Sequence, residues 1–261
     1  MSTSSQLLSL AAGTILETGP ADAVSVAATA GWPAVGIWFD PATWTDDTTR
    51  QVRRRLDDTG VIALDMEPII LGPDGDPGEA VIDAAVAIGA RHVLVASRVA
   101  DLAVVTDRFA VLCDRAGQGN LVLALEFLPI FGVRTLTDAC HVVQAAGRTN
   151  GAVLVDTLHL ARSGGSPADL QALPPALLPY LQIADAPAAP PDGSLPGLVE
   201  EALHGRLLPG DGALPIAAVL EAVPEVPLSF ELRSRALRDR YPDAVDRARA
   251  VLASWQPFIE A

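Results

Sequence analysis

The sequence predicts an α/β protein that folds as a single closed (β/α)8 barrel. Short apolar runs alternate with amphipathic stretches of helical length along all 261 residues, and eight such units in about 250 residues match a barrel of this kind. Most of the apolar runs are continuous rather than alternating, which is typical of a parallel sheet covered on both faces. An open doubly wound sheet is less favoured, because the first run continues as TILETGPAD and lacks a Gly-rich phosphate-binding loop.

The predicted strands are spread along the whole chain. We expect them near residues 7–15, 34–39, 61–66, 92–97, 121–127, 152–156, 181–185 and 227–231. Between them, apolar residues recur every three or four positions, so helices are expected, most clearly in 101–117, 137–147 and 242–255. Pro242 is well placed to begin the last of these helices. A glycine or asparagine closes several helical stretches before the next strand, at Gly60, Gly89, Asn120 and Gly151.

The chain is expected to form one domain, residues 1–261, since no low-complexity linker divides it. The stretch from Asp185 to Gly212 is rich in proline and glycine and interrupts the alternation of strand and helix. We therefore expect a long loop or lid around residues 186–212, after the seventh strand.

The charge of the chain limits its partners. The formal net charge is −14 and the isoelectric point is near 4.5, which argues against nucleic acid and anionic membrane surfaces. The start of the sequence has no basic segment, no apolar run is long enough to span a membrane, and Cys113 and Cys140 fall in apolar helical patterns. These features predict a cytoplasmic protein with a small-molecule substrate, and a homo-oligomer is compatible with them.

The basic residues exclude one class of chemistry. All 18 of them are arginines, so the chain has no lysine that could form a Schiff base with a carbonyl substrate. A carbonyl substrate would need another electrophile, and a metal ion is the natural candidate.

Four polar residues stand at the ends of four consecutive predicted strands: Glu126, Asp156, Gln182 and Glu231. In a (β/α)8 barrel these strand ends meet at one mouth, where the chemistry takes place. Three carboxylates there would repel one another, and a divalent cation resolves that conflict. Oxygen ligands favour Mn²⁺ or Mg²⁺, and Co²⁺ or Zn²⁺ is also compatible. The alternative for each acid alone is a helix cap or an arginine partner.

Two further residues are candidates for binding the substrate at this mouth. His159 follows Asp156 by three residues, and side chains three apart in one strand point to opposite faces. We therefore expect the strand to end at Asp156 and a loop to bring His159 to the substrate; the alternative is a packed or exposed histidine. Arg206 can hold a substrate oxygen or carboxylate with two hydrogen bonds, and its alternative is a surface turn.

Residues after other strands extend this set. Arg233 follows the eighth strand and can accept a carboxylate or phosphate, and Trp38 ends the second strand and can wall the pocket. Glu67, at the end of the third strand, is expected at the rim, in a packing or solvent-facing role rather than a catalytic one.

Several stretches of the sequence resemble one known family. They are LEFLP (125–129), VDTLHLARSGG (155–165), LQIADA (181–186), GRLLPGDGALP (205–215) and SFELRS (229–234). Together they resemble the xylose isomerase-like TIM-barrel superfamily of sugar and sugar-phosphate isomerases and epimerases. The resemblance runs over most of the chain. It implies a TIM barrel in which the metal ligands are Glu126, Asp156, Gln182 and Glu231, and the substrate contacts are His159 and Arg206.

Gln182 departs from the epimerase pattern, because epimerases of this superfamily usually have histidine as the third ligand. A glutamine there resembles the 3-dehydroshikimate dehydratases of the same superfamily. The superfamily also includes an endonuclease branch with a His-rich site of three metals; the four histidines and the net charge of −14 speak against that branch.

We therefore expect a metal-dependent isomerase or epimerase that acts on a sugar or a related polyhydroxy carbonyl compound. The metal would act as a Lewis acid, and Glu126 or Glu231 would remove the α-proton to give an enediolate. A proton returned to the same carbon gives epimerisation, one returned to the neighbouring carbon gives isomerisation, and loss of a β-hydroxyl gives dehydration. The alternatives are therefore a dehydratase of the 3-dehydroshikimate type and, without catalysis, a ligand-binding barrel or partner subunit.

Overall fold

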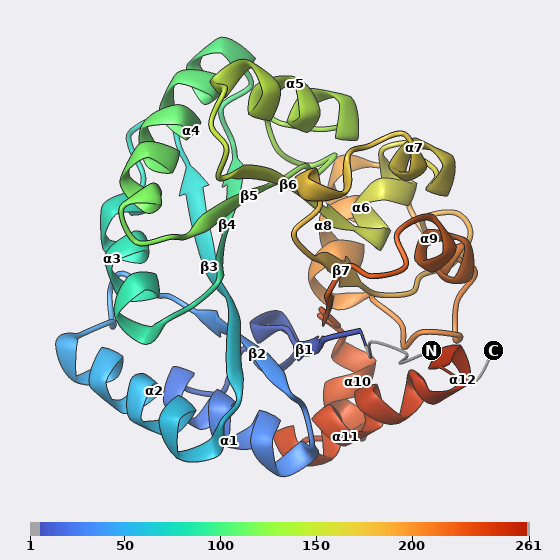
Figure 1. Ribbon diagram of the computed structural model, residues 1–261. Coiled ribbons are helices and arrows are strands. Elements are labelled where there is room, and N and C mark those ends of the chain that lie inside the picture. Colours follow the sequence, from blue (N-terminus) through green and yellow to red (C-terminus); the bar gives the residue numbers. More distant parts are fainter. Residues whose placement is uncertain (1–5, 260–261) are drawn as a thin grey trace, which may run out of the picture.

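Eight parallel strands close into one barrel in the order of the sequence, and helices surround it (Figure 1). The structure is a computed structural model that describes residues 6–259. The strands are β1 (Leu8–Leu10), β2 (Ala34–Trp38), β3 (Ile62–Leu71), β4 (His92–Ser97), β5 (Val122–Glu126), β6 (Gly151–Asp156), β7 (Leu181–Ile183) and β8 (Leu228–Phe230). This arrangement confirms the predicted (β/α)8 TIM barrel.

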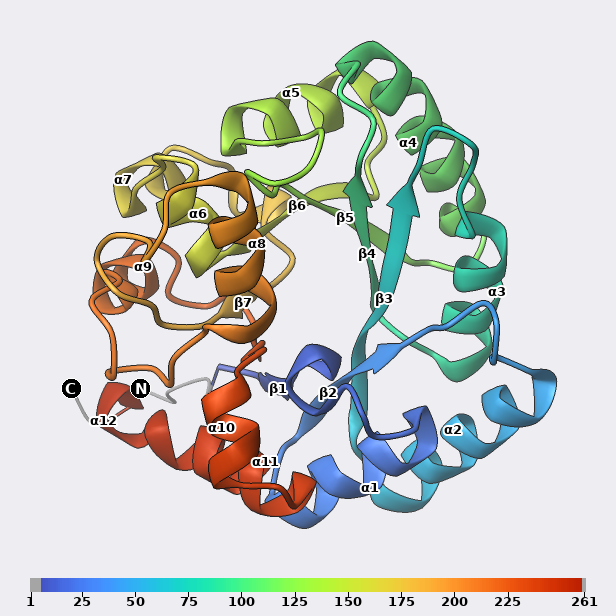
Figure 2. The same ribbon diagram turned by 180° about the vertical axis from the view of Figure 1, so that it is seen from behind.

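Helices cover the outside of the barrel between successive strands (Figure 2). They are α1 (Pro20–Ala30), α2 (Asp46–Thr59), α3 (Gly78–Ile88), α4 (Leu102–Gly117), α5 (Leu136–Ala146), α6 (Thr157–Arg162), α7 (Pro167–Gln171), α8 (Leu195–His204), α9 (Ile216–Ala222), α10 (Arg235–Arg240), α11 (Ala244–Ser254) and α12 (Gln256–Ile259), with short 3-10 helices η1 (Ala12–Ile15) and η2 (Pro175–Leu177). Among the described residues, no helix is long and apolar enough to cross a membrane.

Helix ends follow local capping chemistry more closely than hydrophobic periodicity. Gly60 and Gly89 close α2 and α3 in the left-handed conformation, as predicted. The residue that closes α5 is Gly147, not Gly151, which is already in β6. The last predicted helix was expected to begin at Pro242, but Asp243 caps α11 by accepting the N–H groups of residues 245 and 246.

Two strands differ most in length from the prediction. The first was predicted over 7–15, but it ends at Leu10 because the chain turns into η1. There the Thr14 hydroxyl donates to the carbonyl of Phe230 at 2.7 Å and accepts the N–H of Leu232 at 2.8 Å, which ties the turn to the end of β8. The third was predicted to end at 66, but β3 continues to Leu71 after its register against β4 shifts between Met66 and Ile69.

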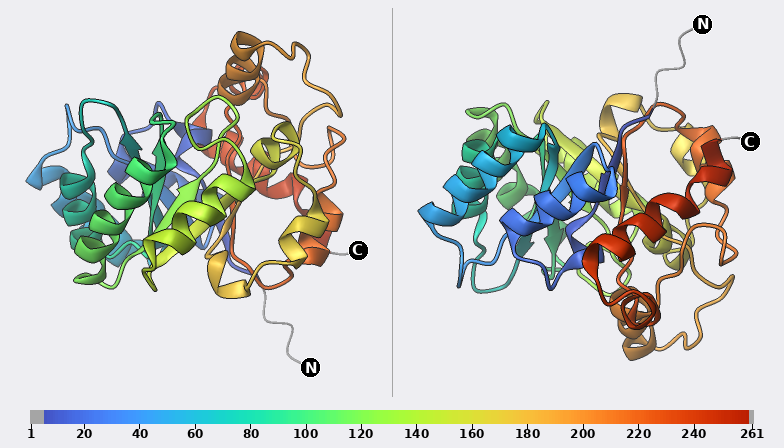
Figure 3. Two further views of the ribbon diagram at one scale, coloured as in Figure 1. Left: turned by 90° about the horizontal axis from the view of Figure 1, so that it is seen from above. Right: turned by 90° about the horizontal axis from the view of Figure 1, so that it is seen from below.

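The segment predicted as a long loop, 186–212, contains helix α8. The Ser194 side chain caps this helix by accepting the N–H of Gly197 at 3.2 Å. Figure 3 shows α8 projecting beyond one end of the barrel. The role of this segment as a lid stays a prediction.

The buried side chains of the barrel include an apolar cluster and three polar residues. The apolar cluster consists of seven side chains, Ala34, Leu64, Leu94, Ala96, Ala124, Leu154 and Tyr180. Ser9, Ser229 and Gln182 are register neighbours on β1, β8 and β7, and all three are fully buried. Burying polar side chains is costly unless they find hydrogen-bond partners.

Candidate active site

A cavity of about 440 Å³ lies at the C-terminal ends of the strands. Its lining includes most of the residues predicted from the sequence and an apolar wall from β3, β4, the loop after β5 and α8. The lining residues are Trp38, Glu67, Pro68, Ile70, Leu94, Ala96, Arg98, Glu126, Leu128, Ile130, Phe131, His159, Val199, Ala202, Leu203, Arg206, Glu231 and Arg233.

Asp156 is the last residue of β6 and also caps the helix that follows. Its Oδ1 accepts the N–H groups of Leu158 at 2.7 Å and His159 at 3.1 Å. The prediction that the strand ends at Asp156 is correct, but the chain continues as helix α6 rather than as a loop. The helix places the His159 ring on the same side as the aspartate, which an extended strand could not do.

Arg206 lies at the centre of the site and is 2% exposed. Its Nη1 donates to Asp156 Oδ2 and its Nη2 contacts Glu231 Oε2 at 3.0 Å. Its Nε donates to the carbonyl of Ala202 at 3.0 Å, which joins the centre of the site to α8. Burial raises the pKa of Asp156, but Arg206 and His159 outweigh it and hold that pKa below its usual value.

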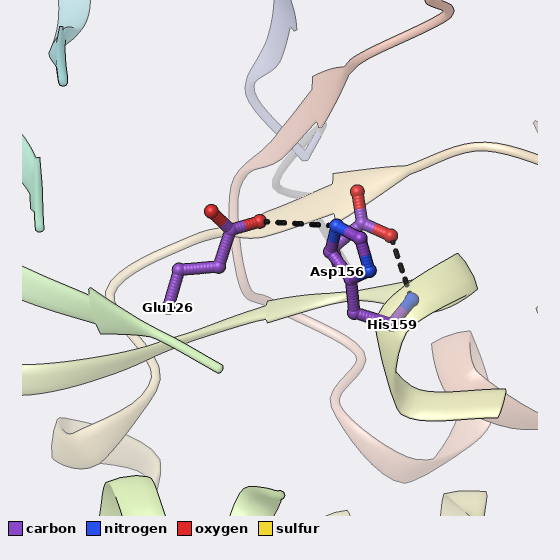
Figure 4. Close-up of side chains that lie close together, drawn as sticks. All are labelled: Glu126, Asp156 and His159. Atoms are coloured by element: carbon purple, nitrogen blue, oxygen red, sulfur yellow. Dashed lines mark hydrogen bonds and ion pairs between the residues drawn. The ribbon is translucent and has the colours of Figure 1, made fainter. Parts of the chain in front are cut away.

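Glu126, Asp156 and His159 converge from β5, β6 and α6 (Figure 4). Each offers one ligand atom, and these atoms lie within 4.8 Å of one another. His159 Nε2 is 3.8 Å from Glu126 Oε1. Burial lowers the pKa of His159 to about 4, so the ring is neutral near pH 7. A neutral histidine at this distance is able to ligate a metal as well as contact a substrate.

The Gln182 side chain lacks a hydrogen-bond partner in the part of the chain that the structure describes. The residue is fully buried in β7, and neither its Oε1 nor its Nε2 has a hydrogen-bond partner among residues 6–259. Its register partners are Asp156 on β6 and Ser229 on β8. A buried polar group without a partner costs free energy, so it indicates a ligand at this position.

Glu231 follows β8 and is almost buried, at 6% exposure. A Cβ atom at Gly13 would overlap Glu231 Oε1, so only glycine leaves room for this carboxylate beside η1. Burial, Glu231 and Asp156, in that order, raise the pKa of Glu126 well above its usual value. The two glutamates therefore interact electrostatically within one cavity.

Arg233 and Trp38 lie together on the other side of the cavity mouth. The Arg233 guanidinium stands over the Trp38 ring, 6.0 Å from its centroid. Both line the cavity, as does Arg98, which no motif in the sequence indicated. Their contacts to a substrate stay predictions.

Asp185, which follows β7, organises the loop after Arg206 rather than the cavity. Its carboxylate accepts the backbone N–H groups of four residues, Ala186, Gly210, Gly212 and Leu214. This network holds the segment GRLLPGDGALP in place. Arg206 is therefore held by α8, which precedes it, and by this loop, which follows it.

The residues at the strand ends fit a divalent cation. Glu126, Asp156 and Glu231 carry up to three negative charges and Arg206 one positive charge, which leaves −3 + 1 = −2. Arg206 already pairs with two of the carboxylates, so an ion would share them with it. Gln182, the register partner of Asp156, offers a further oxygen donor that has no partner among the described residues.

A comparison with known protein families shows to which family the chain belongs. The family described as xylose isomerase-like TIM barrel matches residues 24–255. The chain belongs to the xylose isomerase-like TIM barrel family. The resemblance inferred from the five sequence stretches is therefore confirmed.

Curated relatives within this family are dehydratases. The 3-dehydroshikimate dehydratase of Pseudomonas aeruginosa is 28% identical over 240 residues, which are 86% of this chain and 37% of the relative. The enzyme of the same name from Pseudomonas putida is 26% identical over 247 residues, 86% of this chain and 38% of the relative. The chain thus spans less than two fifths of the length of these relatives.

Solved structures of the family share the fold. A fusion protein of a xylose isomerase-like TIM barrel and 4-hydroxyphenylpyruvate dioxygenase has a TM-score of 0.82 and 24% identity, over 98% of this chain and 43% of that one. The IolI protein with a bound zinc atom has a TM-score of 0.83 and 18% identity, over 97% of this chain and 98% of that one.

Proposed function

We propose that this protein is a divalent-metal-dependent lyase that removes water from a small polyhydroxylated carbonyl compound of the 3-dehydroshikimate type. The observation that supports a metal is Gln182, a buried amide that has no hydrogen-bond partner among residues 6–259 and whose register partner is the carboxylate Asp156. The dehydratase relatives favour loss of water over the isomerisation or epimerisation expected first from the sequence.

The residues proposed to hold the metal are Glu126, Asp156, Gln182 and Glu231. When bound, the ion supplies a Lewis acid that polarises the substrate carbonyl and stabilises negative charge on its oxygen. The chain has no lysine to do this by other means. The ion is Mn²⁺ or Mg²⁺ by the preference of oxygen donors.

The protein's own side chains orient the substrate and move its α-proton. Glu126 or Glu231 takes the proton from the carbon beside the carbonyl. Arg206 keeps Asp156 charged and fixed, and it stays protonated because Asp156 and Glu231 offset the effect of burial on its pKa. Neutral His159 contacts a substrate oxygen, and Arg233 and Trp38 hold the opposite end of the molecule.

Epimerisation or isomerisation is the second candidate, favoured by the placement of the two glutamates. Glu126 and Glu231 come from β5 and β8, which are separated by two strands. Two carboxylates on different walls can serve opposite faces of one carbon, which epimerisation requires. The first proton transfer is common to both candidates.

Product analysis with and without metal separates these functions. The metal-loaded protein is incubated with 3-dehydroshikimate or with ketohexoses in D₂O. A product lighter by one water supports the lyase, whereas an isomer that carries deuterium supports the second candidate. Chelation and Glu126→Gln should each abolish turnover, and Glu225→Gln, an exposed residue outside the cavity, should not.

Turnover that survives exhaustive chelation and is intact in Glu126→Gln would contradict both candidates. A protein that binds no divalent ion and shows no metal-dependent shift in melting temperature would favour the non-catalytic ligand-binding barrel instead.

A further inference from the structure

A third glutamate faces the cavity from the wall opposite the proposed metal ligands. Glu67 lies on β3, is 2% exposed and lines the cavity. The proposed ligands come from β5 to β8, and in the closed order of eight strands β3 is opposite β7 (Figure 1). A substrate held by residues of β5 to β8 therefore has Glu67 on its far side.

The backbone binds one oxygen of this carboxyl group and leaves the other without a hydrogen bond to the described residues. Glu67 Oε1 accepts the N–H of Ala12 at 3.2 Å. Gly36 allows this approach, because a Cβ there would be 3.3 Å from Oε1. Oε2 has no hydrogen-bond partner among residues 6–259, and it is not one of the unpartnered side-chain atoms that are fully buried from solvent. It is therefore available to a bound molecule.

The surroundings favour the neutral acid form of Glu67. Burial raises its pKa well above the usual value, and Asp65, Glu231 and Glu126 raise it further, whereas Arg233 lowers it. Burial and Asp65 are the two largest causes, and neither depends on the proposed metal ligands. Asp65 itself accepts the Tyr180 hydroxyl at 3.2 Å. A protonated carboxyl group is a proton donor.

We propose that Glu67 is the general acid of the dehydration and gives its proton to the hydroxyl group that leaves. The proposal rests on the lyase function above. The base takes the α-proton, the electron pair left on carbon forms the new C=C bond, and the C–O bond to the β-hydroxyl breaks. The Glu67 proton goes to the departing oxygen, so one water leaves and Glu67 becomes a carboxylate. The proton taken by the base returns to Glu67 through water.

A change of leaving group tests this role. Fluoride leaves without a proton, so a substrate with fluorine in place of the β-hydroxyl bypasses a general acid. Glu67→Gln keeps the oxygen that accepts the Ala12 N–H. We expect this variant to lower kcat by roughly 10²–10⁴-fold for the hydroxyl substrate, with KM little changed, and to leave fluoride elimination near the wild-type rate. Glu225→Gln should change neither rate.

Equal loss of both eliminations in Glu67→Gln would show a structural role and overturn the proposal, and so would unchanged elimination of the hydroxyl. If the wild-type protein dehydrates none of the substrates tried, that result refutes the lyase function alone. The protonation state of Glu67 is then measured separately. The infrared spectrum of protein with ¹³C-labelled glutamate should show a protonated carboxyl band at neutral pH that disappears in Glu67→Gln. An ionised Glu67 in that spectrum would overturn its role as an acid.

Discussion

The Gln182 side chain has two hydrogen-bonding atoms and no partner for either in the part of the chain that the structure describes. Leaving a buried polar group unpaired costs about 1–3 kcal/mol. A stable protein keeps such a group when a bound ligand satisfies it. The metal-free protein is therefore less stable than its packing alone would make it.

Gln182→Met separates the cost of burying the unpaired amide from the contribution of that amide to metal binding. Methionine has a similar size and shape and no strong hydrogen-bonding atoms. We expect the metal-free variant to be more stable than the wild type by about 1 kcal/mol, which raises its melting temperature by roughly 2–4 °C. The shift produced by added Mn²⁺ should be smaller than in the wild type. Thermal unfolding with and without the ion measures both, and an unchanged Mn²⁺ shift would mean that Gln182 is not a ligand.

Glu126 should make metal binding depend on pH. Its pKa is raised well above the usual value by burial and by Glu231 and Asp156, so an ion must displace a proton from it. Metal affinity is expected to increase with rising pH, with release of a proton on binding. Calorimetry in buffers of different ionisation enthalpy measures this release, which should be smaller in Glu126→Gln.

At the scale of single residues, the sequence was informative where chain position decides placement. Glu126, Asp156 and Glu231 end apolar runs, so the barrel rule alone predicts that they meet. The bond from Arg206 to Asp156 spans 50 positions and depends on how α8 packs, which no local pattern contains. Glu67 was expected at the rim in a packing or solvent-facing role; it is 2% exposed and lines the cavity, and a strand pattern does not show that Gly36 opens space for it.

Among the secondary-structure elements, η1 shapes the site through a single glycine. A Cβ at Gly13 would overlap the Glu231 carboxylate, so Gly13→Ala must displace that side chain. We expect the variant to fold but to lose most of its Mn²⁺-dependent rise in melting temperature. Gly193→Ala is the control, because nothing lies within 4 Å of a Cβ at that position. An unaltered response to Mn²⁺ in Gly13→Ala would argue that Glu231 does not bind the ion.

Helix α8 is attached to α6 by a buried ion pair. Arg162 contacts Glu201 through two hydrogen bonds of 2.7 Å, and the side chains are 5% and 2% exposed. Loss of one partner of a buried pair costs about 3–5 kcal/mol. Glu201→Met should therefore increase amide hydrogen exchange across 195–204 and lower stability. The neighbouring exposed pair of Glu200 and Arg235, each 57% exposed, provides the control Glu200→Met, which should cost less than about 1 kcal/mol.

Equal exchange rates for 195–204 in Glu201→Met and Glu200→Met would show that the buried pair does not anchor α8. The sequence could not predict this attachment. The proline and glycine between Asp185 and Gly212 indicated a loop, while Ser194 and the apolar positions after it form a capped helix inside that segment.

Over the whole molecule, the buried acids make stability depend on pH. Burial raises the pKa of Asp65 to about 7, from about 3.8 in an unfolded chain. The folded state thus holds a proton that the unfolded state has lost. The stability from this group is fully present below pH 3.8 and is lost as the pH rises through about 7.

Between about pH 5 and about pH 8, Asp65 therefore lowers the melting temperature of the metal-free protein, whereas His92 and His159, whose pKa values burial lowers from 6.5 to about 4, raise it. Glu67 and Glu126 act in the same direction as Asp65, since their pKa values are also raised. Relative to the wild type, Asp65→Asn should raise the melting temperature at about pH 8 compared with that at about pH 5. A variant whose melting temperature changes with pH as in the wild type would contradict the raised pKa of Asp65.

The fold as a whole was predictable because it depends on the order of strands and helices, and the apolar runs in the sequence show that order. The lengths of the strands were harder to predict. β1 ends early where Thr14 bonds to β8, and β3 continues past a register shift. Both deviations come from contacts with other strands. They lie beside the carboxylates Glu231 and Glu67, where the chain departs from regular geometry to make room for a site.

We propose that Glu126, Asp156, Gln182 and Glu231 bind one divalent cation, and anomalous diffraction from crystals of the protein grown with Mn²⁺ tests this proposal. We expect a single strong anomalous peak coordinated by oxygen atoms of these four side chains. A peak elsewhere, or no peak at saturating Mn²⁺, would contradict it.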